Sequence, residues 1–84
     1  MEEKQIGKIT HYFGKIGVAV VELSDELKAG DTIHITGGDR DFTQTVNSMQ
    51  IEHQNVEKAG KGEAVGMKVD QLVKEGDVVY KIVE

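Results

Sequence analysis

Apolar residues in this chain alternate with polar ones in short runs, and a period of two predicts half-buried β-strands. Residues 31–36 read DTIHIT, with Ile33 and Ile35 on one face. Residues 18–23, VAVVEL, are apolar on both phases, which predicts a central strand covered on both faces. Further strands are expected at 5–13, where Ile9, His11 and Phe13 share a face, and at 78–83.

The stretch 42–69 predicts a long bent strand followed by a second strand. Phe42 and Val46 share one phase, whereas Met49 and Ile51 fall on the other, so a bulge near residues 47–48 is expected to bend residues 42–56. Val65, Met67 and Val69 then alternate in the next strand. The polar, glycine-bearing residues 57–63 between them predict a surface turn.

Glycine and aspartate mark the turns. Residues 14–17, GKIG, predict a tight hairpin, residues 37–41, GGDRD, give the strongest turn signal, and residues 24–26 could cap one helical turn. The sequence LKAGD at 27–31 returns as VKEGD at 73–77, each time before a strand. We expect a repeated corner in which the apolar residue plugs the core, glycine bends left-handed, and aspartate bonds to the turn backbone.

These segments predict an all-β fold in one domain spanning residues 1–84. Six short strands, ten glycines, no proline and no convincing helix favour a six-stranded antiparallel Greek-key β-barrel, closed or nearly closed. Phe42 and Tyr80 are expected in its core, which leaves Tyr12 as the available aromatic residue. A barrel this small fills its interior with side chains, so it leaves no reaction pocket.

Composition and charge narrow the function. The chain has no cysteine, no signal-peptide pattern and no apolar run of membrane-spanning length, so a cytoplasmic location is the default. Its formal net charge of −5 disfavours binding nucleic acid mainly through phosphate neutralisation. A local basic rim stays open, formed by Lys15, Lys58, Lys61 and Lys68; the alternative is an ordinary charged surface.

No motif predicts catalysis, a metal or a cofactor. Residues 60–66, GKGEAVG, match neither phosphate-binding glycine motif, so no nucleotide triphosphate is expected. The three histidines lie on separate predicted strands without metal-ligand spacing, and no serine stands in a nucleophile elbow. His53, beside the polar loop, is kept as a ligand contact, although surface decoration is the more common role for such a histidine.

The order of motifs resembles domain 2 of the translational GTPases, the barrel of elongation factors of the Tu and 1-alpha type and of initiation factor two. The resemblance rests on SMQIEHQNVEKA at 48–59, GEAVG at 62–66 and the two corners at 27–31 and 73–77, and it covers roughly residues 5–83. Stand-alone translation-factor-like proteins, and the accessory barrel that ends some collagenase-like peptidases, are similar as well.

This resemblance implies a non-catalytic binding module that contacts tRNA, the ribosome or a translation protein. In the family the acceptor end of tRNA is held between the first hairpin and a later loop, which here correspond to residues 14–17 and 51–65. The candidate contacts for RNA or a partner are Tyr12, Lys15, His53, Lys58, Lys61 and Lys68. The alternative is an adaptor barrel that docks on a separate enzyme or GTPase chain without binding RNA.

Overall fold

The computed structural model describes residues 2–52 and 54–83, and its regular secondary structure is entirely β. The strands are β1 (Glu2–Phe13), β2 (Val18–Leu23), β3 (Leu27–Lys28), β4 (Thr32–Gly37), β5 (Arg40–Thr45), β6 (Met49–Ile51), β7 (Gln54–Val56), β8 (Lys58–Ala59), β9 (Ala64–Lys68) and β10 (Val78–Val83). Among the described residues no helix could cross a membrane.

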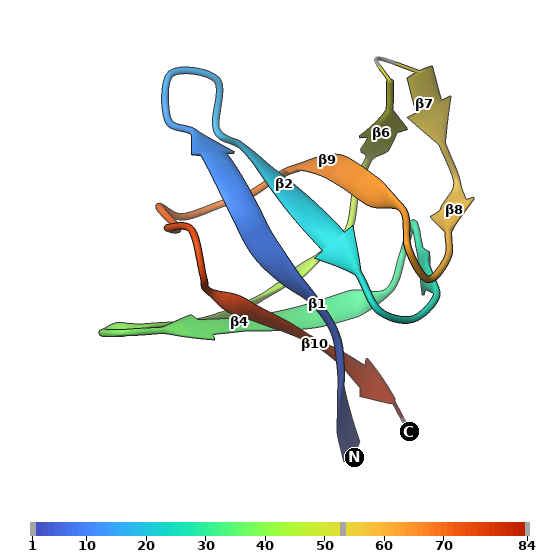
Figure 1. Cartoon of the computed structure of the whole chain (residues 1–84). Coiled ribbons are helices and arrows are strands. Elements are labelled where there is room, and N and C mark those ends of the chain that lie inside the picture. The colour runs from blue at the N-terminus through green and yellow to red at the C-terminus, as the bar shows by residue number, and fades with distance from the viewer. Residues whose placement is uncertain (1, 53, 84) are drawn as a thin grey trace.

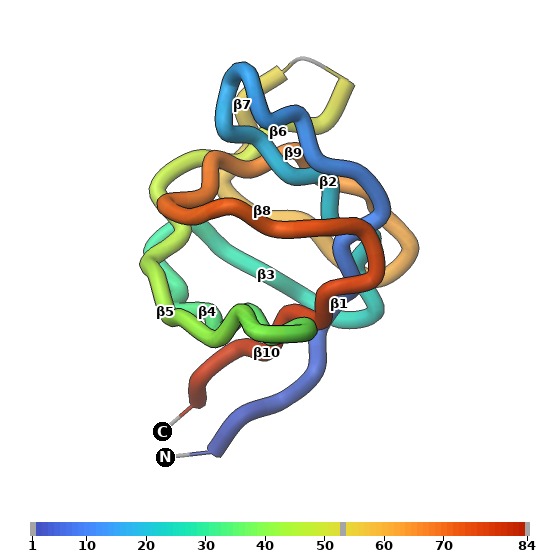
Figure 2. Tube along the Cα trace, turned by 90° about the vertical axis from the view of Figure 1, so that its left-hand side faces the viewer, coloured from blue at the N-terminus to red at the C-terminus, as the bar shows by residue number. Residues whose placement is uncertain are grey.

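Eight of these strands form one antiparallel sheet in the order β5-β4-β10-β1-β2-β9-β6-β7, and β3 pairs with β8 beside it (Figures 1 and 2). The all-β antiparallel prediction is therefore confirmed. The prediction of a closed six-stranded barrel is wrong, because the sheet has eight strands and leaves β5 and β7 at its two ends.

The side chain of Gln44 lies where a closed barrel would need another pair of hydrogen-bonded strands. The sheet curls round its core (Figure 2), and Gln44 on the end strand β5 is only 6% exposed. Its amide nitrogen donates to the carbonyl of Lys68 at 2.9 Å, and its amide oxygen accepts from the backbone N–H of Asp70 at 2.8 Å. Gln44 thus joins β5 to the segment after β9 without backbone pairing.

The interior of this curled sheet is mainly aliphatic, and it includes Phe42 as predicted. The inward-facing positions of the strands and the apolar anchors of both corners make up one buried cluster. Its largest fully buried side chains are Ile6, Ile9, Leu27, Ile33, Ile35, Met49, Met67, Val21, Val46, Val65, Val73 and Val79. Burial of this apolar surface is the main force that holds the strands together.

The first strand is longer than predicted, and two irregularities change its phase. Its register shifts between Gln5 and Gly7 toward β10, and between Ile9 and His11 toward β2. A bulge adds one residue, so the side chains that follow it change face. Tyr12 therefore packs against the core and Phe13 is 47% exposed, which reverses the predicted roles of these two aromatic residues.

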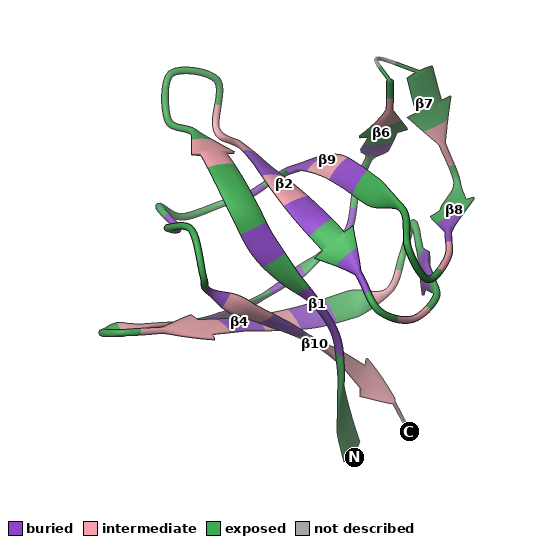
Figure 3. Ribbon diagram, in the orientation of Figure 1, coloured by how far each residue is buried: buried purple, intermediate pink, exposed green. Residues whose placement is uncertain are grey.

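The second strand has the predicted bounds but only one covered face. Ala19, Val21 and Leu23 are buried, whereas Val18 and Val20 are partly exposed, and this alternation is visible along β2 in Figure 3. The prediction that both faces are covered is wrong, because among residues 2–52 and 54–83 no second layer buries Val18 and Val20 on the outer face of β2.

The bend predicted near residues 47–48 is a complete break. β5 ends at Thr45 and β6 begins at Met49, and the phase of buried residues changes between them. The predicted strand 42–56 then folds back as a second hairpin, in which Ile51 pairs with Gln54 and Glu52 takes the left-handed conformation at φ 51°. A non-glycine residue at positive φ gives no simple sequence signal, so this turn was missed.

The predicted helical turn at 24–26 is also absent from the described chain. Residues 24–25 form a bend, and β3 follows at Leu27, which pairs with Ala59 of β8. Both residues are buried, so their apolar side chains hold this small ladder against the core. The loop predicted at 57–63 is consequently shorter than expected, because residues 58–59 belong to β8.

The two corners have the predicted construction. Gly30 and Gly76 have φ of 95° and 92°, and the carboxylates of Asp31 and Asp77 accept from the N–H of Lys28 and Lys74 at 2.9 and 3.1 Å. Each corner also exchanges two backbone hydrogen bonds with one distant residue, Val46 just after β5 in the first corner and Ile9 of β1 in the second. The strands that leave the corners, β4 and β10, pair antiparallel with each other.

Both chain ends lie at one pole of the domain. Glu2 pairs with Val83, and Figures 1 and 2 show the N and C labels side by side. The hairpin between β1 and β2 extends to the opposite pole in Figure 1.

Candidate binding groove

The outer face of β2 and β9, together with the β1–β2 hairpin, encloses a groove of about 320 Å³. Its lining is mainly apolar and comes from segments far apart in the sequence. The apolar residues are Phe13, Ile16, Val18, Val20, Ala64 and Gly66, and Gln50 and Glu52 line the side that β6 contributes.

Strand register explains why the surface is hollow at this point. Val20 pairs with Gly66, and Gly66 pairs with Gln50, so a residue without a side chain stands in the middle of a cross-strand row. A Cβ atom at Gly66 would meet Val18 Cγ1 at 3.5 Å, an ordinary contact, and φ there is not positive. The backbone at residue 66 does not require glycine. The hollow therefore exists because this position has no side chain to fill the space above β9.

The hairpin supplies an apolar wall to the groove. The N–H groups of Ile16 and Gly17 both donate to the carbonyl of Phe13, at 3.2 and 2.9 Å, and Gly17 closes the turn at φ 67°. Phe13 is 47% and Ile16 63% exposed, and the rings of Phe13 and His11 meet edge to face with centroids 4.4 Å apart. Large apolar side chains gathered on an exposed hairpin are typical of a binding surface.

Opposite charges flank the groove at its two ends. Lys68 pairs with Val18 near the hairpin, whereas Glu22 pairs with Ala64 at the other end. Glu52, in the turn that follows β6, lines the groove together with Ala64. At about 3.3 Å per residue, Val18 and Glu22 are roughly 13 Å apart along β2.

The structure divides the four predicted lysines among three places. Lys15 lies in the hairpin turn and Lys68 at the adjacent end of β9. Lys61 lies at the opposite end of β2, because its neighbour Gly62 donates to the carbonyl of Leu23 at 2.9 Å. The expected single rim is therefore not formed.

The remaining predicted contacts lie elsewhere. Lys58 is on β8, opposite Lys28, beside a wider hollow of about 790 Å³ that both residues line together with Glu57, Ala29 and Val56. Tyr12 is packed against the core, and His53 lies outside the described residues. The proposed binding roles of all these residues stay predictions of the sequence.

Sequence reasoning placed a site between residues 14–17 and 51–65 by resemblance, and the groove lies between these two segments. It missed the apolar lining, because Val18 and Val20 were assigned to a buried face and Phe13 to the core side of β1. The alternation of residues in the sequence did contain a pattern that predicts this groove. An apolar outer face on one strand beside Ala64 and Gly66 on the next leaves both a surface to cover and room above it.

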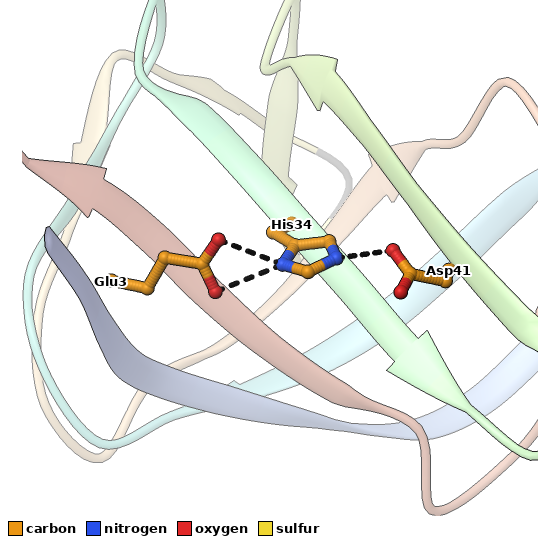
Figure 4. Close-up of polar contacts among 3 residues, drawn as sticks. All are labelled: Glu3, His34 and Asp41. Carbon is orange, nitrogen blue, oxygen red and sulfur yellow. Dashed lines mark hydrogen bonds and ion pairs between the residues drawn. The ribbon is translucent and has the colours of Figure 1, made fainter. Parts of the chain in front are cut away.

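Apart from the groove, a polar cluster of Glu3, His34 and Asp41 joins the strands β1, β4 and β5 (Figure 4). His34 on β4 places Nδ1 2.9 Å from both carboxylate oxygens of Glu3, and Nε2 2.5 Å from Oδ1 of Asp41. Hydrogen bonds to Glu3 and then Asp41 raise the pKa of His34, and its side chain is only 18% exposed. Imidazolium, which donates from both nitrogens, fits this arrangement.

This cluster is suited to structure rather than to proton transfer. Both ring nitrogens of His34 face carboxylates, so neither is free to take a proton from a substrate. Within residues 2–52 and 54–83 no group of three or more histidine, aspartate or glutamate side chains is placed to hold a metal ion. The cluster therefore fastens β1 to β4 across β10, which lies between them.

Comparison with known proteins relates the chain to peptidases. It is 47% identical over 81 residues to a protease of Methanocaldococcus jannaschii described as uncharacterized, and 38% identical over 82 residues to a collagenase of Porphyromonas gingivalis. Each alignment covers 95% of this chain but only 20% and 23% of the relative. The chain thus spans about a fifth of the length of these relatives. No family model matches it.

Solved structures show the same fold in a separate domain. The crystal structure of the C-terminal domain of a protein assigned as a U32 peptidase, from Geobacillus thermoleovorans, has a TM-score of 0.89 and 20% identity. The match covers 95% of this chain and 93% of that one. Its selenomethionine variant gives a TM-score of 0.86 over 90% and 96%.

These relatives overturn the functional interpretation of the sequence. The primary resemblance to translational GTPases is wrong, and with it the translation-associated binding module, its RNA-binding role and the alternative adaptor on a separate enzyme or GTPase chain. The expectation of a non-enzymatic protein is contradicted too, because the relatives are named protease and collagenase. The physical reason for the error is that the corner and strand motifs record how a small β-domain folds and not what it binds.

Proposed function

We propose that this chain is a domain of the U32-peptidase C-terminal type and that it serves the hydrolysis of polypeptides. The observation that carries the proposal is the match with relatives named protease and collagenase, which extends over 95% of this chain. The fold it shares with a separately crystallised C-terminal peptidase domain supports the same assignment.

The role assigned to the domain is to hold the polypeptide substrate for a catalytic part that corresponds to the other four-fifths of the relatives. The groove supports this role, because it offers an exposed apolar surface at the pole opposite the chain ends. A domain joined to a larger body through either end would present the groove away from the junction.

A domain exchange in the Porphyromonas collagenase tests the proposal. The region that matches this chain is replaced by residues 1–84, deleted, or replaced by an unrelated small β-domain, and hydrolysis of native and heat-unfolded collagen is measured. We expect the exchange with this chain to retain most of the activity and the other two proteins to lose at least tenfold in kcat/KM. Equal activity of all three proteins would refute the proposed role.

A further inference from the structure

Charge and shape together define the chemistry of a ligand for the groove. The floor at Gly66 has room for one aliphatic side chain, which Phe13 and Ile16 would cover from the hairpin. Glu52 lines the groove, Glu22 follows Val20 on the outer face of β2 beside Ala64, and Lys68 flanks the other end beside Val18. Within the part of the chain that the structure describes, Glu22, Glu52 and Lys68 form no ion pair that would neutralise these ends.

An extended polypeptide fits this pattern by its own geometry. In an extended chain residues i, i+2 and i+4 project to one side, and residues i and i+4 are roughly 13 Å apart, the same interval that separates Val18 from Glu22. A basic residue at one position, an aliphatic residue in the middle and an acidic residue at the other would therefore meet all three parts of the groove at once.

Other ligand classes use less of this surface. Nucleic acid would bring its phosphates against Glu22 and Glu52, which oppose binding. A sugar could stack on Phe13 but would leave the charged ends without partners. A polypeptide supplies an apolar side chain and both signs of charge at the required interval.

We propose that the groove binds an extended segment of the polypeptide substrate with the pattern basic–x–aliphatic–x–acidic, the aliphatic side chain resting on Gly66. The basic residue faces Glu22 and Glu52, and the acidic residue faces Lys68. Calling this polypeptide the substrate rests on the function proposed above, whereas the chemistry of the groove does not.

The direct test is an NMR titration of the ¹⁵N-labelled chain with a capped peptide, acetyl-Gly-Lys-Ala-Leu-Ala-Asp-Gly-amide. We expect the largest amide shifts at Val18, Val20, Gln50 and Gly66. Replacing the central leucine of the peptide by glycine should weaken binding at least tenfold, because burial of that side chain supplies most of the affinity. Replacing its aspartate by lysine should weaken binding several-fold.

Variants of the chain test the same contacts from the other side. Gly66→Leu fills the hollow and should weaken binding at least tenfold, and Gly66→Ala should weaken it less, since only one methyl group is added. Glu22→Gln combined with Glu52→Gln should weaken binding of the lysine-bearing peptide several-fold. Leu72→Ser is the matched control, because Leu72 is 60% exposed but does not line the groove, and its affinity should be unchanged.

Folding of each variant is checked by its thermal melt and by the amide spectrum away from the groove. The inference is overturned if the peptide causes no shifts at millimolar concentration, or if Gly66→Leu, folded as the parent, binds equally well. It is also overturned if sedimentation shows that a second copy of the chain occupies the groove. Peptide binding with no effect of domain deletion on collagen hydrolysis would refute only the proposed function, and the reverse pair of results would refute only this inference.

Discussion

At the scale of single residues, Asp77 is the most demanding polar group of the described core. It is 2% exposed, and its carboxylate accepts from Arg40 Nε at 2.7 Å, from a terminal guanidinium nitrogen of Arg40 at 2.8 Å, and from the N–H of Lys74 at 3.1 Å. These bonds hold the pKa of Asp77 below its ordinary value, and the hydrogen bonds from Arg40 have the largest effect. A buried carboxylate is tolerated only with partners of this kind.

The internal repeat supplies a matched control for the contribution of this ion pair. We expect Asp77→Asn to lower the free energy of unfolding by about 2–3 kcal/mol, because the guanidinium of Arg40 then loses its charged partner. Asp31→Asn, at the equivalent corner, removes a turn bond but no ion pair and should cost about 1 kcal/mol. Urea unfolding at pH 7 measures both values, and equal losses would show that the corner, not the pair with Arg40, is what matters.

His34 makes the stability of the fold depend on pH, and its contribution decreases as the pH rises. Its pKa is raised in the folded state, so the charged ring contributes fully below its unfolded value of 6.5. That contribution disappears as the pH rises through the raised pKa, where the folded ring loses its proton. The lowered pKa of Asp77 acts oppositely, since its contribution is present above 3.8 and is lost as the pH falls through the folded value.

We therefore expect His34→Gln to remove stability at pH 5.5 but little at pH 9. The difference at low pH should be about 1 kcal/mol, because the charge-assisted bonds to Glu3 and Asp41 are partly screened by solvent. Urea unfolding of both proteins across this range provides the measurement, and His11→Gln is the control, since its contact with Glu75 is exposed. A constant difference at all pH values would contradict the assignment of a titrating His34.

Sequence reasoning reached the corners but not the histidine cluster, and the reason is the separation along the chain. Each corner is built within five residues, so glycine, aspartate and the apolar anchor could be interpreted together at 27–31 and 73–77. Glu3 lies 31 residues from His34 in the sequence. The two meet because their strands, β1 and β4, lie on either side of the single strand β10 in the sheet. No local pattern encodes that neighbour relation.

At the scale of strands, alternation located most segments but could not count residues at a bulge. The bounds predicted for β2 and β10 are those observed, and in β2 buried residues alternate with exposed or half-buried ones along the whole strand. In β1 the shift after Ile9 exchanged the roles of Tyr12 and Phe13. The groove depends on that shift, because Phe13 would otherwise point toward the core.

Adding a methyl group at Gly7, which is tightly packed, and at Gly66, on the open outer face, should change stability in different ways. A Cβ at Gly7 would stand 2.7 Å from Val21 Cγ1 and 2.9 Å from the carbonyl of Glu22, so Gly7→Ala forces the pair β1–β2 apart. We expect it to cost about 1–3 kcal/mol by overpacking. Gly66→Ala meets only ordinary contacts and should be neutral or stabilise by up to about 1 kcal/mol. Thermal melts compare the two, and destabilisation by Gly66→Ala would mean that the hollow is structurally required.

At the scale of the whole molecule, the arrangement of strands separates attachment from binding. The chain ends are paired with each other through Glu2 and Val83 at one pole, and the hairpin of the groove lies at the other. The principal extents of 32 × 25 × 20 Å make the domain longer than it is wide. The sequence could not show this separation, because it results from the order of eight strands and from the side-chain link at Gln44 that takes the place of barrel closure.

Circular permutation tests this separation of poles. Joining residues 84 and 1 by a short glycine–serine linker and opening the chain between Gly38 and Asp39 leaves the groove intact. We expect this permutant to fold and to bind the lysine- and aspartate-bearing peptide with unchanged affinity, because the ends are adjacent and the β4–β5 turn is exposed. Opening between Lys15 and Ile16 cuts the hairpin wall and should weaken binding at least tenfold while the core ladder persists. Titration and melting of both permutants provide the comparison, and equal affinities would place the binding surface away from the hairpin.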